Sequence, residues 1–243
     1  MFINYAHRGA SEYEPENTLS AFYAGVAMGA NGIETDIQRT KDGILVLFHD
    51  DTLKRVTGAE GSIGDYTYEE LLRFTVHNKA CDRFDTIPTL EAFLTYFGWR
   101  DLTFAIELKM DGVAEQTIDL LERFCVREKV ILTSFNPDSI RAAKAYDPRY
   151  RVGYLFTEKE KDPVGVLRDM GGEEICPEAH TMTPEQTANW HELGFNVRAW
   201  GVYNTDLMAH AIACGADGMT VNFPDKLTAF LRTQNSGMKQ TLR

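Results

Sequence analysis

Short apolar segments alternate with amphipathic segments along almost the whole chain, and this alternation constrains the fold more than any other feature. A strand buried on both faces gives a short apolar run, whereas a helix that covers a sheet has apolar residues at i, i+3 and i+4. Repeated βα units of this kind build a parallel sheet. Because 243 residues suit one closed barrel, we expect a (β/α)8, or TIM, barrel in which residues 1–243 form a single domain.

The strand pattern occurs in nine segments, one more than the barrel needs. They are Phe2–Ala6, Gly32–Ile37, Ile44–Phe48, Leu102–Leu108, Val130–Phe135, Arg151–Phe156, Glu174–Pro177, Asn196–Val202 and Gly218–Val221. Only residues 38–43, which include Asp42-Gly43, separate the second and third segments. So short a link cannot hold a parallel crossover and predicts an antiparallel hairpin. We therefore interpret Ile44–Phe48 as the return arm of a hairpin on the second barrel strand.

The helical pattern fills most of the intervals between the strands. It covers Thr18–Met28, Leu90–Tyr96, Val113–Phe124, Ser139–Tyr146, Pro184–Leu193, Asp206–Ala213 and Lys226–Leu231. The polar, glycine-containing segment at about residues 50–86 fits no βα unit and has one short helical piece, Tyr68–Phe74. We predict an insertion in the loop after strand two, on the barrel face that carries active sites.

Carboxylates lie at the carboxyl ends of two predicted strands. Glu34 and Asp36 are two residues apart, so both side chains point to the same face, and Glu107 ends the strand Leu102–Leu108. Three carboxylates at one barrel mouth repel one another unless they bind a cation. Oxygen ligands indicate one divalent cation, Mg2+ or Ca2+. The alternative for each residue alone is a strand-end charge paired with a nearby Arg or Lys.

Two histidines end segments that lead to the same face. His7 ends the first strand and His49 ends the hairpin arm, on either side of the predicted metal. A lone histidine is more often structural, but a pair beside a metal is what general acid–base cleavage of a phosphodiester requires. Asp50 either orients His49 or begins the following turn.

The acidic balance of the chain argues against nucleic acid as a partner. Asp and Glu outnumber Lys and Arg by 36 to 25, for a formal net charge of −11. An anionic substrate therefore needs local positive charge, which Arg8 and Lys109 supply unless they only form salt bridges with neighbouring carboxylates. Trp200 either forms the floor of the pocket, against a glycerol backbone, or fills the barrel.

These residues belong to motifs that follow one another in a fixed order. They are His7-Arg8-Gly9, Pro15-Glu16-Asn17-Thr18, Glu34-Thr35-Asp36 with Thr40-Lys41-Asp42-Gly43, His49-Asp50, Ile87-Pro88-Thr89-Leu90 and Glu107-Leu108-Lys109. The ordered set resembles the glycerophosphodiester phosphodiesterase family. The resemblance implies hydrolysis of glycerophosphodiesters, such as deacylated phospholipid head groups, to glycerol 3-phosphate and an alcohol. It also implies the metal, acid–base and phosphate-binding roles given above.

Two positions depart from the pattern of the family that the chain resembles. Asn222 stands where relatives often have Asp, and Gly201 stands where Thr is usual. We expect neither residue to touch the predicted metal ligands or histidines, so that both departures affect only the alcohol pocket.

Two other functions are compatible with the same barrel fold. One is a lysophospholipase D-like or cyclising phosphodiesterase, and the other is a non-catalytic barrel that binds a phosphorylated ligand, although binding alone needs no histidine pair. Four widely spaced cysteines and no apolar run of about 18 residues predict a cytoplasmic protein without stable membrane association. The motifs leave the head group, the choice between Mg2+ and Ca2+ and the oligomeric state open.

Overall fold

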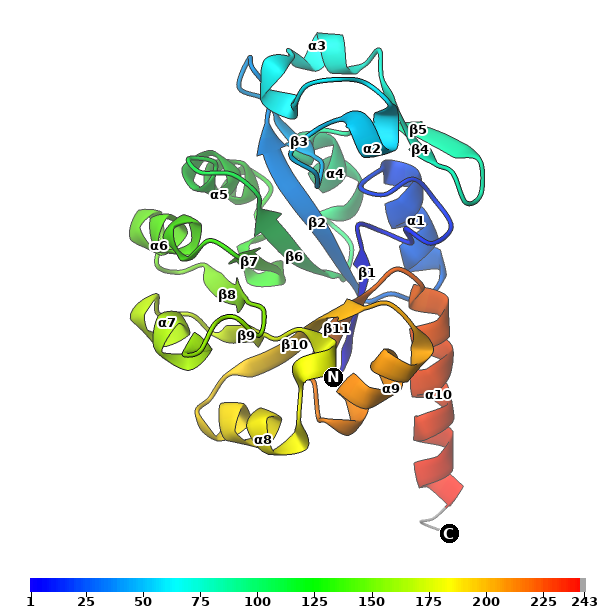
Figure 1. The fold of residues 1–243 in the computed structure, drawn as a ribbon, viewed down its shortest axis with the longest axis vertical. Helices are drawn as coiled ribbons and strands as arrows, with labels where there is room; N and C mark the ends of the chain where they lie inside the picture. Colours follow the sequence, from blue (N-terminus) through cyan, green and yellow to red (C-terminus); the bar gives the residue numbers. More distant parts are fainter. Residues whose placement is uncertain (241–243) are drawn as a thin grey trace.

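Helices surround a closed parallel barrel in the computed structural model, which describes residues 1–240 and the side chains of residues 1–234 (Figure 1). The barrel strands are β1 (Ile3–His7), β2 (Gly32–Arg39), β6 (Thr103–Leu108), β7 (Val130–Ser134), β8 (Arg151–Leu155), β9 (Glu174–Cys176), β10 (Asn196–Val202) and β11 (Gly218–Val221). Each strand pairs with its neighbour in parallel, and β1 closes the ring by pairing with both β2 and β11. The predicted fold class, a (β/α)8 barrel, is confirmed.

The ninth strand of the sheet is the return arm of a hairpin. β3 (Leu45–Leu47) pairs antiparallel with the end of β2, with Leu47 opposite Ile37. The hairpin continues one residue further, because the Phe48 amide donates to the Asp36 carbonyl at 3.0 Å. The predicted hairpin is therefore correct, and it places His49 at the level of Asp36.

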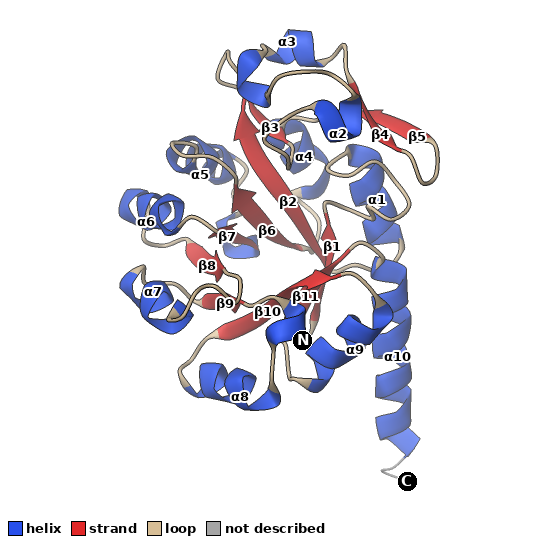
Figure 2. Cartoon of the chain, in the orientation of Figure 1, coloured by secondary structure: helices blue, strands red, loops and turns tan. Residues whose placement is uncertain are grey.

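Eight helices of the described chain lie outside the barrel (Figures 1 and 2). They are α1 (Leu19–Ala27), α4 (Leu90–Phe97), α5 (Ala114–Arg123), α6 (Pro137–Tyr146), α7 (Pro163–Asp169), α8 (Pro184–Glu192), α9 (Thr205–Ala213) and α10 (Pro224–Gln240). The sequence did not predict α7, whose one buried residue, Leu167, gives no apolar periodicity. Two 3-10 turns, Arg127–Lys129 and Ala179–Thr181, complete the connections.

The insertion after strand two has an apolar cluster of its own. It contains α2 (Lys54–Thr57), a 3-10 turn (Ile63–Asp65), α3 (Tyr68–Leu71) and a hairpin of β4 (Thr75–Asn78) with β5 (Arg83–Thr86). Its buried side chains pack against Val46 and Phe48 of the hairpin arm. The β4–β5 hairpin was not predicted, because Arg83, Phe84 and Thr86 are all exposed and give no alternating pattern. The insertion thus packs directly on the arm that carries His49.

Aromatic side chains pack α1 and α4 against the barrel wall. Phe22 of α1 lies edge to face with Phe93 at 5.0 Å and with Phe97 at 5.9 Å between ring centroids. Phe93 in turn meets Phe104 of β6 at 5.4 Å, and all four rings are fully buried. Within the part of the chain that the structure describes, no helix combines the length and apolar character needed to cross a bilayer.

We expect Phe22→Ala to lower the free energy of unfolding by about 3–5 kcal/mol, because it leaves a cavity between two helices and the barrel. Chemical denaturation measures the loss. The control is Leu72→Ala, at a side chain that is 51% exposed, which should change stability by about 0.5 kcal/mol or less. Equal losses in the two variants would show that the aromatic cluster does not anchor α1.

Candidate active site

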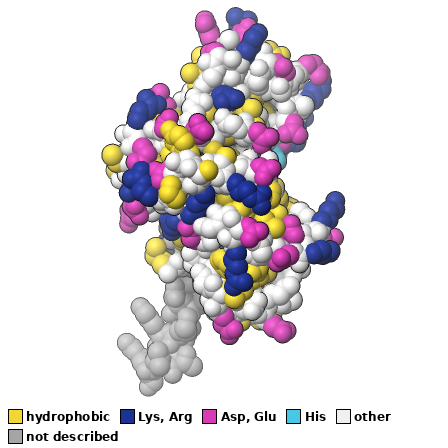
Figure 3. Space-filling view, turned by 90° about the vertical axis from the view of Figure 1, so that its left-hand side faces the viewer, with side chains coloured by type: hydrophobic (Ala, Val, Ile, Leu, Met, Phe, Trp, Pro, Cys, Tyr) yellow, Lys and Arg dark blue, Asp and Glu magenta, His cyan; other side chains and the backbone are white. Residues whose placement is uncertain are grey.

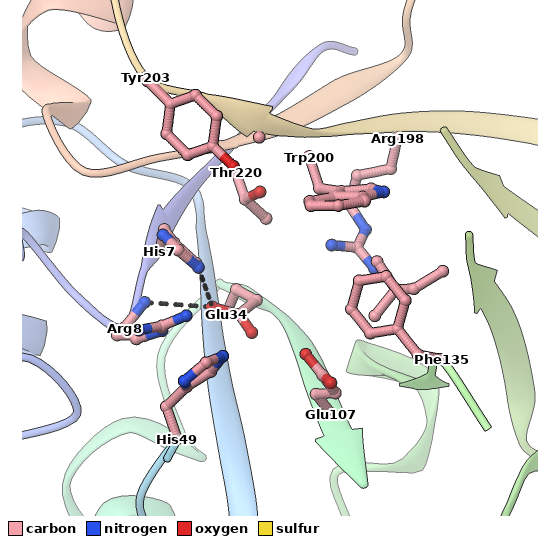
Figure 4. Close-up of a pocket in the computed structure, with 12 residues that line it drawn as sticks. His7, Arg8, Glu34, His49, Glu107, Phe135, Arg198, Trp200, Tyr203 and Thr220 are labelled. Carbon is pink, nitrogen blue, oxygen red and sulfur yellow. Dashed lines mark hydrogen bonds and ion pairs between the residues drawn. The ribbon is translucent and has the colours of Figure 1, made fainter. Parts of the chain in front are cut away.

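A pocket of about 290 Å³ opens at the carboxyl ends of the barrel strands. Figure 4 shows His7, Arg8 and His49 along one side of it and Phe135, Arg198 and Trp200 along the other, with Glu34 and Glu107 between them. Basic and acidic side chains are interspersed on the molecular face in Figure 3, rather than gathered in one basic patch. Inside the pocket, Arg8 and Arg198 supply positive charge for an anionic ligand.

Three buried carboxylates meet at the base of this site. Asp36 of β2 lies opposite Glu107 of β6 in the sheet register, and Glu34 lies two residues earlier on the same face of β2. One oxygen atom of each carboxylate lies within 4.8 Å of the others. Oδ1 of Asp36 is buried and accepts no hydrogen bond from any described residue. Lys109 Nζ, a charged neighbour, lies 3.9 Å from this oxygen. A buried carboxylate oxygen that accepts no hydrogen bond, among three oxygen donors, suits a hard divalent cation.

The pKa values of the three carboxylates diverge because they are buried together. Burial, and then the charge of Asp36, raises the pKa of Glu34 well above its usual range and that of Glu107 to about 7. Burial acts in the same direction on Asp36, but the guanidinium of Arg8, with His49 and Lys109, outweighs it and lowers the pKa of Asp36. A cation among them removes this mutual repulsion.

Asn17 fixes the orientation of Asp36. Its amide nitrogen donates to Asp36 Oδ2 at 2.8 Å, and its amide oxygen accepts from the Thr35 hydroxyl at 2.8 Å. Asn17 is buried and has a φ of 56°, a left-handed conformation that asparagine tolerates better than most residues. The sequence placed Asn17 in a motif but gave it no role, because this contact depends on where the β1–α1 loop turns.

His7 lies at the end of β1, and each nitrogen of its ring lies close to one other side chain. Nδ1 is 2.6 Å from Oδ1 of Asn222, and Nε2 is 3.9 Å from Oε2 of Glu34. Because a carbonyl oxygen only accepts, Nδ1 carries the proton and Nε2 keeps its lone pair. Burial, and then the charge of Arg8, lowers the pKa of His7 to about 4. The expectation that Asn222 touches neither histidine is wrong, because the loop after β11 brings it beside β1.

His49 follows the hairpin arm and is held by both its neighbour and β2. Its Nδ1 is 2.8 Å from Oδ1 of Asp50, so Asp50 contacts the ring of His49 directly. The side-chain amide of Gln38 donates to the carbonyls of Phe48 at 3.1 Å and Asp50 at 2.8 Å, on either side of His49. Gln38 was missed because the predicted hairpin gave no indication of which side chains bridge its two arms.

Both predicted cations lie within reach of the carboxylates. Arg8 Nε is 3.3 Å from Oδ2 of Asp36, and Lys109 Nζ is 3.0 Å from Oε1 of Glu107. Burial alone would lower the pKa of Lys109, but Glu107 and Asp36 outweigh burial and raise it. Arg8 and Lys109 therefore stay charged beside the site, as ion-pair partners of its carboxylates.

The opposite wall of the pocket is largely aromatic. Trp200 of β10 lies edge to face with Phe135 at 5.0 Å, and its indole nitrogen donates to the Phe156 carbonyl at 3.1 Å. Tyr203, which the sequence did not single out, also lines this wall. Gly201 lies between Trp200 and Tyr203 at a φ of 71°, where β10 shifts register against β11. This irregular strand end brings both rings to the pocket.

Comparisons with known proteins identify relatives of this fold and site. The model of the glycerophosphoryl diester phosphodiesterase family matches residues 7–226. The glycerophosphodiester phosphodiesterase of Caldanaerobacter subterraneus subsp. tengcongensis is 33% identical over 234 residues, which cover 93% of this chain and 96% of that protein. The glycerophosphodiester phosphodiesterase of Bacillus altitudinis is 31% identical and covers 91% of this chain and 95% of its own.

A solved structure shares the barrel as a whole. It is a phosphodiesterase from Oleispira antarctica in complex with the product sn-glycerol-3-phosphate, and it superposes with a TM-score of 0.86 at 25% identity. The match covers 95% of this chain and 96% of the Oleispira chain.

A tight turn after β1 sets the position of His7 and Arg8. Arg8 and Gly9 both have positive φ, 55° and 83°. A Cβ on Gly9 would lie 2.4 Å from the carbonyl carbon of Ala21 in α1, closer than any side chain can approach. Only glycine therefore satisfies both the dihedral angle and the contact with α1.

Gly9→Ala should lower the free energy of unfolding by about 2–5 kcal/mol, the combined cost of a left-handed alanine and a backbone clash. Gly58→Ala provides a matched control, because Gly58 has a φ of 75° but no atom within 4 Å of an added Cβ. We expect the control to lose about 1–2 kcal/mol in urea denaturation. If the two variants lost the same stability, the contact with α1 would not be the constraint.

Proposed function

The chain belongs to the glycerophosphoryl diester phosphodiesterase family, and we propose that it is a metal-dependent hydrolase that converts glycerophosphodiesters to glycerol 3-phosphate and an alcohol. The observation that carries this proposal is the convergence of three buried carboxylates, one oxygen of each within 4.8 Å of the others, at the base of the pocket that His7 and His49 line. The product in the Oleispira antarctica relative supports a substrate of the same class.

In this proposal Glu34, Asp36 and Glu107 hold one Mg2+ or Ca2+. The bound cation supplies Lewis-acid stabilisation of negative charge at the phosphoryl group. Arg8 and Lys109 bind phosphate oxygens, the first through a planar fork of donors and the second as a point charge. Both already lie beside the carboxylates, so no side chain has to enter the site when substrate binds.

The two histidines transfer the protons. His7 keeps the lone pair of Nε2 free, because Nδ1 donates to Asn222, and so accepts a proton from the attacking water. The water oxygen forms a bond to phosphorus while the bond from phosphorus to the leaving oxygen breaks. His49 donates its Nε2 proton to the leaving alkoxide, and the adjacent carboxylate of Asp50 orients the His49 ring through Nδ1.

Trp200 and the aromatic wall give the organic part of the diester an apolar surface. Residues 1–243 act as one domain in this proposal, with the insertion at about residues 50–86 packed on the hairpin arm that carries His49. The cytoplasmic location stays a prediction from the cysteine pattern. The absence of nucleic acid as a partner stays a prediction from the acidic balance of the chain, and the absence of stable membrane association one from the lack of a long apolar run. Product analysis by phosphorus NMR separates hydrolysis from release of a cyclic phosphate.

His7→Ala and His49→Ala should each lower kcat by about 10²–10⁴-fold, the usual contribution of a general acid or base. Release of glycerol 3-phosphate, coupled to a dehydrogenase, measures turnover over a panel of glycerophosphodiesters. Calorimetric titration with Mg2+ or Ca2+ should give nearly wild-type affinity for both variants, because neither histidine is a proposed ligand. Wild-type activity in both variants would refute the acid–base assignment.

Chelation by EDTA should abolish turnover, and added Mg2+ or Ca2+ should restore it. A cation at 100 times its Kd should also stabilise the fold by about 2.7 kcal/mol, seen as a higher Tm. Asp36→Asn should remove both effects, whereas Glu115→Gln, at an exposed position in α5, should keep them. Full activity in EDTA would contradict the proposed metal site.

A further inference from the structure

We propose that Arg55, in the insertion, is a positioning residue for this reaction, whose guanidinium joins the segment that carries His49 to the loop that carries Arg8. This inference rests on the proposed function. Arg55 belongs to α2 and is not among the residues that line the pocket of His7 and His49. It therefore acts through the residues it contacts.

One side of the Arg55 guanidinium forms a bidentate ion pair with Asp50. Nε of Arg55 lies 2.6 Å from Oδ2 of Asp50, and Nη2 lies 2.9 Å from Oδ1. Oδ1 of Asp50 also lies 2.8 Å from Nδ1 of His49. Because the carboxylate is held by two parallel bonds, it cannot rotate about its χ2 angle without breaking the pair. The plane of Asp50, and with it the direction of the His49 ring, is thus set from the insertion.

The same guanidinium also forms a bidentate ion pair with Glu16 in the β1–α1 loop. Nη1 and Nη2 of Arg55 each lie 2.7 Å from one oxygen of Glu16. Oε1 of Glu16 lies 2.8 Å from Nη1 of Arg8. A continuous series of side-chain contacts therefore connects Arg8 to His49 through Glu16, Arg55 and Asp50. The two ends of this series are the proposed phosphate-binding and acid–base residues.

The environment of the pairs favours a positioning role over a surface salt bridge. Arg55 is 50% exposed, but the Glu16 and Asp50 side chains are only 18% and 21% exposed. Burial alone would raise the pKa of Asp50, yet hydrogen bonds from Arg55 and His49 lower it to about 2, so Asp50 stays ionised. The two carboxylates that Arg55 fixes contact Arg8 and His49 directly. We therefore expect the loss of Arg55 to be seen in kcat, through the geometry of those two residues.

The side-chain type matters because both partners are bound bidentately. Arginine presents five donors in a planar fork, whereas lysine presents one compact charge. A lysine at position 55 can neutralise one carboxylate but cannot fix the planes of two. Arg55→Lys should therefore fail to restore what Arg55→Ala loses, although it keeps the charge.

The experiment compares Arg55→Ala and Arg55→Lys with Lys54→Ala in the metal-loaded, full-length protein. Lys54 is a matched control in the same helix, and its ion pair is with Glu60 inside the insertion. We expect kcat to fall about 10–100-fold in both Arg55 variants, the usual effect of removing a group that orients a site residue. Lys54→Ala should keep wild-type kcat and KM, and all three variants should keep wild-type metal affinity.

A double-mutant cycle separates positioning from a general effect on folding. Asp50→Asn weakens the same chain of contacts, so its combination with Arg55→Ala should lose less than the product of the two single losses in kcat. The combination of Asp50→Asn with Lys54→Ala should be multiplicative. Wild-type kcat in Arg55→Ala, multiplicative losses with Asp50→Asn, or a loss that matches a fall in the folded fraction would each overturn the proposal.

A second readout does not depend on turnover. Nitrogen-15 NMR of histidine-labelled protein reports the Nδ1–H of His49, which should give a distinct, hydrogen-bonded signal in the wild type. That signal should shift or broaden in Arg55→Ala and stay in place in Lys54→Ala. An unchanged signal would overturn the positioning role. A wild-type protein that turned over no glycerophosphodiester would refute the proposed function instead, and the NMR comparison would still decide the role of Arg55.

Discussion

Mutual repulsion among three buried carboxylates is the constraint around which the site is arranged. Glu34, Asp36 and Glu107 converge because β2 and β6 are adjacent and in parallel register, so their inward side chains meet at one level. Polar neighbours offset the negative charge of these carboxylates. Arg8 and Lys109 do so with their positively charged side chains, and Asn17 does so by donating a hydrogen bond from its amide. In a chain with a net charge of −11, these two cations give the proposed phosphodiester local positive charge at one point of the site.

The two histidines are not equivalent, and their partners explain the difference. His7 meets the neutral amide of Asn222, whereas His49 meets the carboxylate of Asp50. A neutral acceptor fixes one tautomer of His7, while the carboxylate orients the ring of His49 through Nδ1. In the proposed mechanism, two copies of one residue type would take opposite roles in proton transfer, because different loops provide their surroundings.

Periodicity predicted the parts of the structure that depend on local sequence. Strand alternation placed Glu34 and Asp36 on one face, and the short link at residues 38–43 predicted the hairpin that returns His49. Two of the contacts that were missed join distant segments: Asn222 with His7 across 215 positions, and Arg55 with Glu16 across 39. No local pattern records such pairs, because they exist only once the barrel is closed and the insertion has folded onto β3.

The hairpin between β2 and β3 also means that the contacts around the two histidines can form at different stages of folding. The contact of Gln38 with Phe48 spans 10 positions along the chain, so the surroundings of His49 need only a small loop to close. The surroundings of His7 need β1 to meet β11, the most distant pair of strands in the sequence. A chain whose ring is still open can hold His49 beside Asp36 without orienting His7. In the proposed mechanism, competence for proton transfer would therefore report on barrel closure, which is the event of highest contact order in this topology.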